Sequence, residues 1–280
     1  MDTLACPACR GELKFSGESD DRRLISGELA CAGCGLVFPV EDEVPELVPP
    51  GVDYGGAIWD GMEADTARLV PEWVPKNFEK AVGRSQSPLM REFIDEVRAV
   101  EGPVIDIASG PGGSFCIDVM KEGDTDGLLV MSDLGRPVMK AWQRQLRDVG
   151  WADSCSFMVF DARKMPFKSE SIPMFTSVGG LNSICGNQRL AYEETARVLR
   201  PDGRLLDIIG MWEEGGSNQT QMRERNCIST WAEYEALLCG LGLTIERWPV
   251  YSTSKMVSED GVSQREEVCE WRLVFVRKKG

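Results

Sequence analysis

A short apolar run that breaks into glycines constrains this chain more than any other stretch. Residues 104–107 read Val-Ile-Asp-Ile, which is typical of a parallel strand covered on both faces. Gly110-Pro-Gly112-Gly113 follows, and apolar residues then recur at helical spacing over 115–120. This order predicts a strand, a tight turn whose backbone approaches a ligand, and a helix whose N-terminus faces that ligand.

Two acids accompany this turn. Asp106 lies inside the strand, where a carboxylate needs hydrogen-bond partners. Asp133 ends the next apolar run, 128–131, and follows Gly112 by 21 residues. An acid at about that distance, at the tip of the second strand, is placed to bind a ribose diol. Dinucleotide enzymes carry Gly-x-Gly-x-x-Gly here, and Phe115 occupies the third glycine position, so a dinucleotide fits less well. A plain turn without a ligand is the alternative.

Composition narrows the class of protein. The 280 residues suffice for one large domain and a small one. No apolar run approaches the roughly 20 residues that span a bilayer, and the first residues lack the pattern of a signal peptide. Ten cysteines without such a signal indicate a reducing compartment, so we expect a cytoplasmic protein.

Charge and histidine content exclude several functions. The net charge is −14, which disfavours a nucleic-acid binder because phosphate contacts need a cationic face. The chain has no histidine, so a histidine base, a Ser/His or Cys/His nucleophile and a histidine metal ligand are all excluded.

Two Cys-x-x-Cys pairs mark the first 50 residues, which we expect to form a separate unit. Cys6 and Cys9 are separated from Cys31 and Cys34 by 21 residues. Four thiolates with this spacing suit a closed tetrahedral zinc site, and a metal contributes on the order of 10 kcal/mol to such small modules. The alternatives are two disulfides or cysteines that bind no metal. Iron in place of zinc is also compatible with four thiolates.

The pattern Cys-Pro-x-Cys…Cys-x-x-Cys-Gly-x-x-Phe-Pro-Val, continued by Val44-Pro-Glu-Leu47, resembles two known zinc ribbons. One is the small ribbon that activates tRNA, rRNA and protein methyltransferases. The other is fused to bacterial 23S rRNA guanine-N1 methyltransferases. Residues 1–50 contain ten Asp or Glu and only four Arg or Lys. We therefore expect the ribbon to have a structural or docking role rather than to bind RNA.

The central motifs resemble class I S-adenosylmethionine-dependent methyltransferases. Asp106-x-Ala108-x-Gly110-x-Gly112 is similar to their first motif, with Ala108 at the first glycine position. Asp161-Ala-Arg-Lys-Met-Pro-Phe167 resembles the motif after the third strand of quinone-type methyltransferases, in which the acid and the next amide bind adenine. The resemblance implies a set of S-adenosylmethionine contacts: Asp106, Ala108, Gly110, Gly112, Asp133, Leu134, Asp161, Ala162 and Val178.

The remaining pattern alternates strands and helices. We expect strands at 157–160, 174–178, 205–209, 243–251 and 268–277, helices at 138–146, 193–199 and 230–241, and a polar loop at 252–267. The resemblance implies a Rossmann-like seven-stranded α/β sheet with an antiparallel last strand. The predicted units are a zinc ribbon (1–50), a linker and helical cap (51–101) and a methyltransferase domain (102–280). In the cap we expect a helix after Ser87. We expect the aromatic residues Tyr54, Trp59 and Trp73 either to pack on the core or to line an acceptor pocket.

The predicted reaction is methyl transfer to a small molecule or metabolite. Asn182 follows the fourth strand and by resemblance lies nearest the methyl group; it orients an acceptor or caps the next helix. An rRNA acceptor is the first alternative, favoured by the ribbon's resemblance and the order of the domains. Arg136, Lys140, Arg144 and Arg147, on the helix after Asp133, either form a modest basic face or only solvate an exposed helix. A non-catalytic S-adenosylmethionine-binding or partner-docking module is the second. The sequence does not identify the acceptor, a general base or the oligomeric state.

Overall fold

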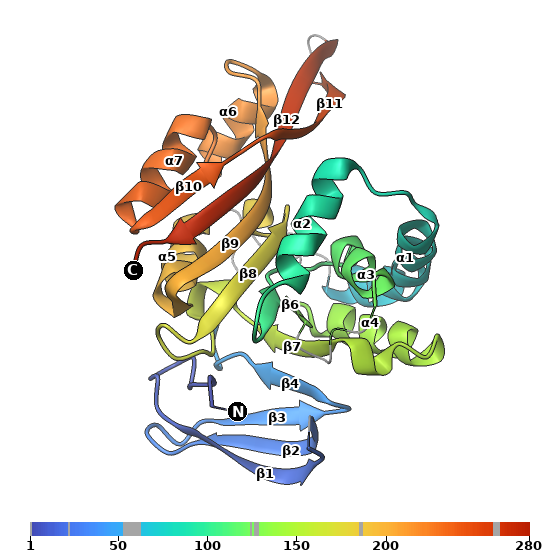
Figure 1. Cartoon of the computed structure of the whole chain (residues 1–280), viewed down its shortest axis with the longest axis vertical. Helices are drawn as coiled ribbons and strands as arrows, with labels where there is room; N and C mark the ends of the chain where they lie inside the picture. Colours follow the sequence, from blue (N-terminus) through green and yellow to red (C-terminus); the bar gives the residue numbers. More distant parts are fainter. Residues whose placement is uncertain are drawn as a thin grey trace.

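The computed structural model describes residues 2–21, 23–52, 63–123, 125, 129–184, 187–259 and 264–280. Their strands form one sheet in the order β1-β2-β3-β4-β7-β6-β5-β8-β9-β12-β10, with β11 paired to β12 (Figure 1). The strands are β1 (Leu13–Ser19), β2 (Leu24–Cys31), β3 (Val37–Glu41), β4 (Val44–Leu47), β5 (Val104–Asp106), β6 (Leu129–Asp133), β7 (Ser156–Phe160), β8 (Ile172–Val178), β9 (Leu199–Trp212), β10 (Leu243–Arg247), β11 (Val250–Glu259) and β12 (Gln264–Lys278).

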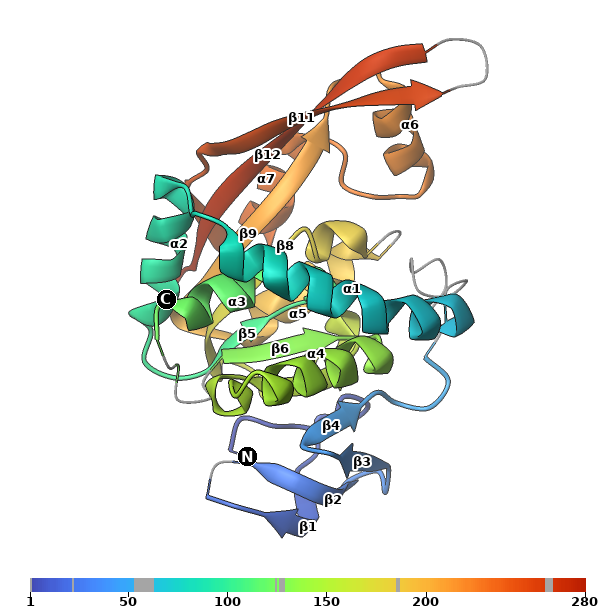
Figure 2. The ribbon, with the colours of Figure 1, turned by 90° about the vertical axis from the view of Figure 1, so that its right-hand side faces the viewer.

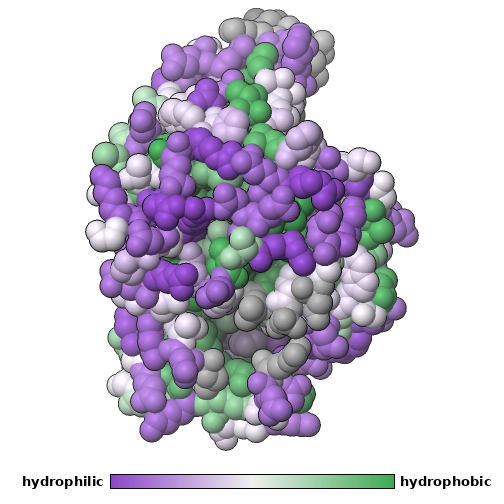
Figure 3. Space-filling model, viewed as in Figure 1, coloured by the Kyte–Doolittle hydropathy of each residue, from purple (hydrophilic) through white to green (hydrophobic). Residues whose placement is uncertain are grey.

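Helices cover both faces of this sheet. They are α1 (Glu63–Gly83), α2 (Pro88–Arg98), α3 (Ser114–Lys121), α4 (Arg136–Asp148), α5 (Gln188–Val198), α6 (Ser217–Glu224) and α7 (Trp231–Gly240), with short 3-10 turns η1 (Ala152–Ser154), η2 (Ala162–Lys164) and η3 (Leu181–Ser183). Helices α1 to α4 share one hydrophobic cluster, and α5 and α7 share another on the opposite face (Figure 2). The surface on the side seen in Figure 1 is mainly hydrophilic (Figure 3), so both clusters are largely covered there.

The centre of the sheet is parallel. Strands β7, β6, β5, β8 and β9 run in one direction, and β12 enters antiparallel between β9 and β10. The chain leaves β5 for β6 on one side and reaches β8 on the other, which creates a switch point at the carboxyl ends of β5 and β8. Ligands of open α/β sheets bind at such a point. The predicted fold class, with its antiparallel last strand, is confirmed.

The Cys-x-x-Cys ribbon covers a sheet face that has no crossover helix. Between β7 and β8, residues 161–171 contain only the short turn η2. Without a helix here, the apolar side chains of β5, β6 and β7 on this face are covered by the ribbon. Side chains of the ribbon and of the sheet belong to one buried cluster. Its members include Leu4, Leu13, Leu29, Phe38 and Leu47 from the ribbon, and Ile105, Val130, Met158 and Phe160 from the sheet. The ribbon thus occupies the place of a missing helix.

Backbone pairing and ion pairs also join the ribbon to the sheet. Strand β4 pairs in parallel with β7, placing Leu47 opposite Phe160. Arg23 of the ribbon pairs with Asp153 at 2.7 Å and donates to the Ala152 carbonyl at 2.9 Å. The ribbon therefore shares a buried core with the main sheet, and the predicted division into units at residues 50 and 101 stays a prediction.

The segment before β5 is more helical than the sequence suggested. Helix α1 contains Pro71 and Pro75, and proline inside a helix lacks a backbone donor. Val70, Val74 and Phe78 nevertheless fall on one side and are buried, and this burial outweighs the two missing backbone donors. The helix predicted after Ser87 is confirmed, because the Ser87 hydroxyl accepts from the Met90 amide at 3.2 Å.

Of the three aromatic residues predicted for this cap, Trp73 is half-buried on α1. Tyr54 and Trp59 lie outside the described residues, so the choice between core packing and an acceptor pocket stays a prediction.

The predicted polar loop 252–267 is wrong. Strands β11 and β12 extend through most of it as a long hairpin arm. Its polar composition predicted a loop, and one of its acids, Glu267, is nevertheless buried. Its carboxylate accepts from the backbone amides of Ser217 at 2.6 Å and Asn218 at 2.9 Å, so it caps α6, a helix that the sequence analysis missed.

A buried acid lies in β9 on the α5–α7 face. Asp207 is fully buried, and its Oδ2 accepts from the hydroxyls of Tyr192 at 2.7 Å and Tyr234 at 2.9 Å. Burial raises the pKa of Asp207 from 3.8 to about 6, although the tyrosine hydrogen bonds oppose this shift. A raised folded-state pKa means that the folded protein binds a proton more tightly than the unfolded chain, so stability is lost as pH rises from about 4 through 6.

We expect Asp207→Asn to remove this pH dependence. Between pH 4.5 and 7.5 the wild type should lose about 2 kcal/mol through this group, from a pKa raised to about 6. The variant should gain that amount relative to wild type at pH 7.5, as measured by urea unfolding at both pH values. Asp148→Asn, at an exposed helix end, is the control. Parallel pH profiles of wild type and Asp207→Asn would contradict the assignment.

Candidate functional site

The predicted ligand contacts gather at one edge of the sheet. Asp161, Asp133, Asp106 and Val178 lie at or directly after the carboxyl ends of β7, β6, β5 and β8. These four strands are neighbours in the sheet. The structure therefore brings together residues that are spread over more than 70 positions of the sequence, at the switch point of the fold.

The turn after β5 has a fixed and unusual backbone. Ala108, Gly110 and Gly113 have positive φ angles of 52°, 59° and 30°. A Cβ at Gly113 would lie 2.5 Å from the Trp142 ring, and the Trp142 indole donates to the Gly110 carbonyl at 2.9 Å. Gly112 faces open space. Ala108 adopts a conformation that favours glycine, at a cost of roughly 1–2 kcal/mol, so the departure from the motif keeps the shape of the turn.

Asp106 braces this turn from inside. Its two carboxylate oxygens accept from the hydroxyls of Ser109 at 2.6 Å and Thr176 at 2.7 Å. The side chain is buried, and burial raises the pKa of Asp106 to about 6. Both oxygens therefore hold β5, its turn and β8 together, and the predicted contact of Asp106 with a ligand stays a prediction.

Asp133 links the turn to the next strand. Its Oδ2 accepts from the Gly110 amide at 2.9 Å and its Oδ1 from the Gly135 amide at 2.7 Å. Burial raises the pKa of Asp133 to about 6, against the effect of these amides. Each carboxylate oxygen can accept a second hydrogen bond, which is the capacity that a vicinal diol requires. Leu134 follows and is half-buried.

Asp161 and Ala162 form the start of η2. The Asp161 carboxylate accepts from the Arg163 amide at 2.8 Å and from the Arg163 guanidinium at 2.9 Å. Asp161 is buried and paired, so a ligand amine would share this carboxylate with Arg163. This arginine was missed in the sequence, where its charge alone gave no signal.

Asn182 lies in η3, beyond the tip of β8. Its amide nitrogen donates to the Gly210 carbonyl at 3.4 Å, and its backbone carbonyl accepts from the Gln188 side chain at 2.8 Å. Helix α5 is preceded by Asn187 as its N-cap residue, so Asn182 does not cap it. The Asn182 Oδ1 is buried without a partner among the described residues. The orientation of this amide is assigned from the hydrogen bond between its nitrogen and the Gly210 carbonyl.

Gly180 at this edge carried no sequence signal, whereas Val178 was predicted as an S-adenosylmethionine contact. A Cβ at Gly180 would lie 2.3 Å from the Ile107 carbonyl oxygen, so only glycine lets the segment after β8 rest on the turn after β5. Val178, at the tip of β8, is 41% exposed although it is apolar. The tip of β8 thus presents an open apolar surface beside Asn182.

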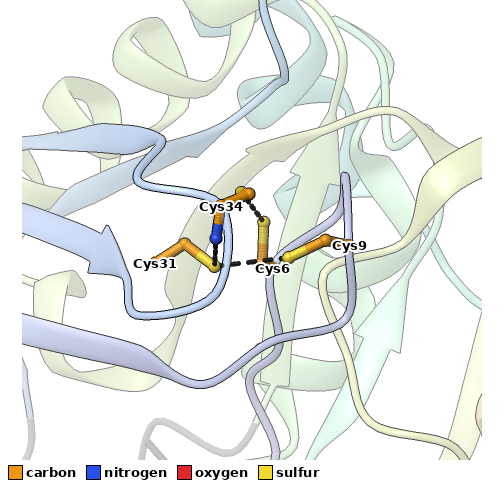
Figure 4. Close-up of side chains that lie close together, drawn as sticks. All are labelled: Cys6, Cys9, Cys31 and Cys34. Carbon is orange, nitrogen blue, oxygen red and sulfur yellow. Dashed lines mark hydrogen bonds between the residues drawn. The ribbon is translucent and has the colours of Figure 1, made fainter.

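The four cysteines of the ribbon converge on one point (Figure 4). Their sulfurs all lie within 4.8 Å of one another, with Cys6–Cys34 at 3.7 Å and Cys9–Cys31 at 3.4 Å. These distances are too long for disulfides. They match the roughly 3.8 Å edge of a tetrahedron with zinc–sulfur bonds of about 2.3 Å. The structure therefore brings the four predicted zinc ligands together, and four thiolates around one ion would leave no open position for catalysis.

Comparison with known proteins agrees with this architecture. Residues 1–43 match the family model of the Trm112p-like protein, and residues 105–207 match that of a methyltransferase domain. The ubiquinone/menaquinone biosynthesis C-methyltransferase UbiE of Pseudomonas fluorescens is 32% identical over 42% of this chain and 46% of its own length. That of Hahella chejuensis is 32% identical over 37% and 41%. The chain thus spans less than half the length of these relatives.

Solved structures share the fold. A putative methyltransferase from Bacillus halodurans has a TM-score of 0.53 at 16% identity, covering 68% of this chain and 98% of that one. The [4+2]-cyclase SpnF also has a TM-score of 0.53, at 13% identity, covering 78% and 96%. Because one of these is named as a cyclase, the fold alone does not fix the reaction. Within the described part of the chain, no helix has the length and apolar character needed to span a membrane.

Proposed function

We propose that this chain, in which a Trm112p-like zinc ribbon precedes a methyltransferase domain, transfers the methyl group of S-adenosylmethionine to a small-molecule acceptor. The observation that carries the proposal is the Asp133 carboxylate. It binds the Gly110 amide at 2.9 Å and so joins an acid suited to a ribose diol to the glycine turn that a charged ligand can approach.

The residues at this edge fit that cofactor. Asp133 would take the ribose hydroxyls. The turn at Gly110 and Gly112 would face the amino-acid portion, and a Cβ at Gly112 would meet nothing within 4 Å. Asp161 and Ala162 would meet the adenine, with Leu134 and Val178 beside it. When bound, S-adenosylmethionine supplies an electrophilic methyl group. The protein's contribution is to orient the two reactants and exclude water.

Asn182 would serve the acceptor. Its buried Oδ1 has no partner among the described residues, and leaving such an acceptor unpaired costs about 1–3 kcal/mol. A hydroxyl or N–H group on the acceptor would satisfy it. The amide is neutral and does not take a proton, so Asn182 would orient the acceptor rather than activate it.

The charges around α4 favour a small acceptor over rRNA. Arg136 and Lys140, two of the four residues of the predicted basic face, pair with the ribbon acid Glu41. Lys140 also contacts Asp42 at 3.4 Å. These two cations are therefore paired with acids of the ribbon, and Arg144 and Arg147 are the exposed remainder of the predicted basic face. The relatives' names, which refer to quinone biosynthesis, point in the same direction.

The experiment uses S-adenosylmethionine with a radiolabelled methyl group. The metal-loaded protein is incubated with it and an extract of host cells that lack this gene, and RNA, protein and small molecules are then separated and counted. We expect label in the small-molecule fraction, and none there with the Asp133→Ala variant.

Other outcomes decide between the alternatives. Label in RNA that requires Asp133 would replace the small-molecule proposal by an RNA methyltransferase. Absence of both transfer and cofactor binding would favour a non-catalytic docking module.

A further inference from the structure

A cavity of about 420 Å³ lies between the ribbon and the main sheet. Pro103, Ser156 and Ile172 line it. Pro103 directly precedes β5, and Ser156 and Ile172 are the first residues of β7 and β8. The residues proposed to hold S-adenosylmethionine lie at the carboxyl ends of the same strands. The cavity is therefore at the opposite edge of the sheet from the candidate cofactor site.

The walls of this cavity are mainly apolar and come from both sides of the junction. Leu4, Val130 and Met158 line it, and each is 9% exposed, more than any other described member of the buried cluster that ribbon and sheet share. The shared core is thus incompletely filled at this point. Phe15 and Leu24 of the ribbon complete the wall and are half-buried. A cavity of this size with such walls is typical of a small-molecule site.

The charged groups of the lining are mainly acidic. The acids among the described lining residues are Asp20, Asp21 and Glu43. Arg23 is the cation among them, and its guanidinium is already paired with Glu43 at 3.0 Å and with Asp153 at 2.7 Å. Asp20 and Asp21 are exposed, so this end of the cavity meets solvent. The excess of acid there favours a ligand that carries a positive charge.

We infer that this cavity is a binding site for an amphipathic amine. The apolar chain of the ligand would lie between the ribbon and the sheet, where burial removes hydrocarbon from water. Its protonated amino group would lie at the end formed by Asp20, Asp21 and Glu43. Such a ligand would contact both sides of the junction and so stabilise the folded protein. The inference does not depend on methyl transfer, because none of the described lining residues is one proposed to hold S-adenosylmethionine.

The test measures binding of octylamine, octan-1-ol and octanoate to the metal-loaded, full-length protein by isothermal titration calorimetry. These probes have similar chains and differ in charge. We expect octylamine to bind at least about tenfold more tightly than octanoate, with octan-1-ol between them, and this preference to shrink in about 1 M salt. Butylamine should bind on the order of 100-fold more weakly than octylamine, because it buries four fewer CH₂ groups.

Two pairs of variants locate the ligand. Leu24→Trp fills the cavity from the ribbon side and should weaken octylamine binding at least about tenfold, whereas Leu190→Trp, at an exposed position of α5 outside the lining, should not. Asp21→Asn should reduce the preference for octylamine over octanoate about threefold. Asp148→Asn, the same change at the exposed end of α4, should leave that preference unchanged.

The melting temperature of each variant identifies a loss of binding that is due to misfolding. Octylamine is also titrated in the presence of S-adenosylhomocysteine, and we expect no competition between the two. The inference would be overturned by any of these results: no octylamine binding to wild type, equal affinity for the three probes, or competition with S-adenosylhomocysteine.

Unchanged octylamine binding by a folded Leu24→Trp protein would also overturn it. If Leu24→Trp does not fold, the exposed Asp21→Asn change decides, and an unchanged charge preference there would overturn the inference. Failure of wild type to bind S-adenosylhomocysteine would count against the proposed function and not against this site.

Discussion

Asp133→Ala should weaken S-adenosylhomocysteine binding at least about 100-fold. The substitution removes the carboxylate proposed to bind the ribose hydroxyls, and charge-assisted hydrogen bonds contribute about 1.5–3 kcal/mol each. It also releases the Gly110 amide, which the Asp133 Oδ2 holds at 2.9 Å, so the turn after β5 loses a support. Isothermal titration calorimetry of wild type and variant measures the change.

Two variants make this result specific. Asp133→Asn keeps the size of the side chain and one oxygen, and should bind more weakly than wild type but more tightly than Asp133→Ala. Asp148→Ala, at the exposed end of α4, should bind as wild type does. Unchanged affinity of a folded Asp133→Ala protein would place the cofactor elsewhere.

Cys31→Ser should destabilise the whole protein and not only the ribbon. The ribbon side chains Leu4, Leu29 and Phe38 share a buried cluster with Val130 and Met158 of the sheet, so loss of the metal exposes the face of β5, β6 and β7. A loss of roughly 5 kcal/mol corresponds to a fall in melting temperature of about 10–20 °C for a protein of this size. Differential scanning calorimetry should show one transition, shifted downward.

The control for this prediction is Cys239→Ser, which changes an exposed cysteine of α7 outside the cluster and should leave the melting temperature within about 2 °C of wild type. Chelation of the metal from wild type should reproduce the Cys31→Ser result. A separate low-temperature transition for the ribbon, with the main transition unmoved, would show that the ribbon folds independently and that the shared core contributes little.

Local patterns predicted much of this molecule. The strand at 104–107, its glycine turn and the acid at the end of the next strand were recognisable because parallel strands and their turns have a distinctive composition. The four cysteines were recognisable because metal ligands need fixed spacing. The fold class and its antiparallel last strand followed from the resemblance to a known fold.

Contacts distant in sequence explain what was missed. Helix α1 forms despite Pro71 and Pro75 because its apolar side packs on α3 and α4. Helix α6 depends on a cap from Glu267, some 50 residues later in the chain. Likewise, nothing local to Trp271 shows that Gly210 of β9 and Gly179, which follows β8, make room for its indole.

The central claim is that the glycine turn and Asp133 hold S-adenosylmethionine. The most direct measurement is titration of the metal-loaded wild-type protein with S-adenosylhomocysteine and, separately, with NAD. The account predicts saturable one-to-one binding of S-adenosylhomocysteine and no binding of NAD at the same concentrations, because Phe115 stands where a dinucleotide turn has its third glycine. Binding of NAD alone, or of neither ligand, would contradict it.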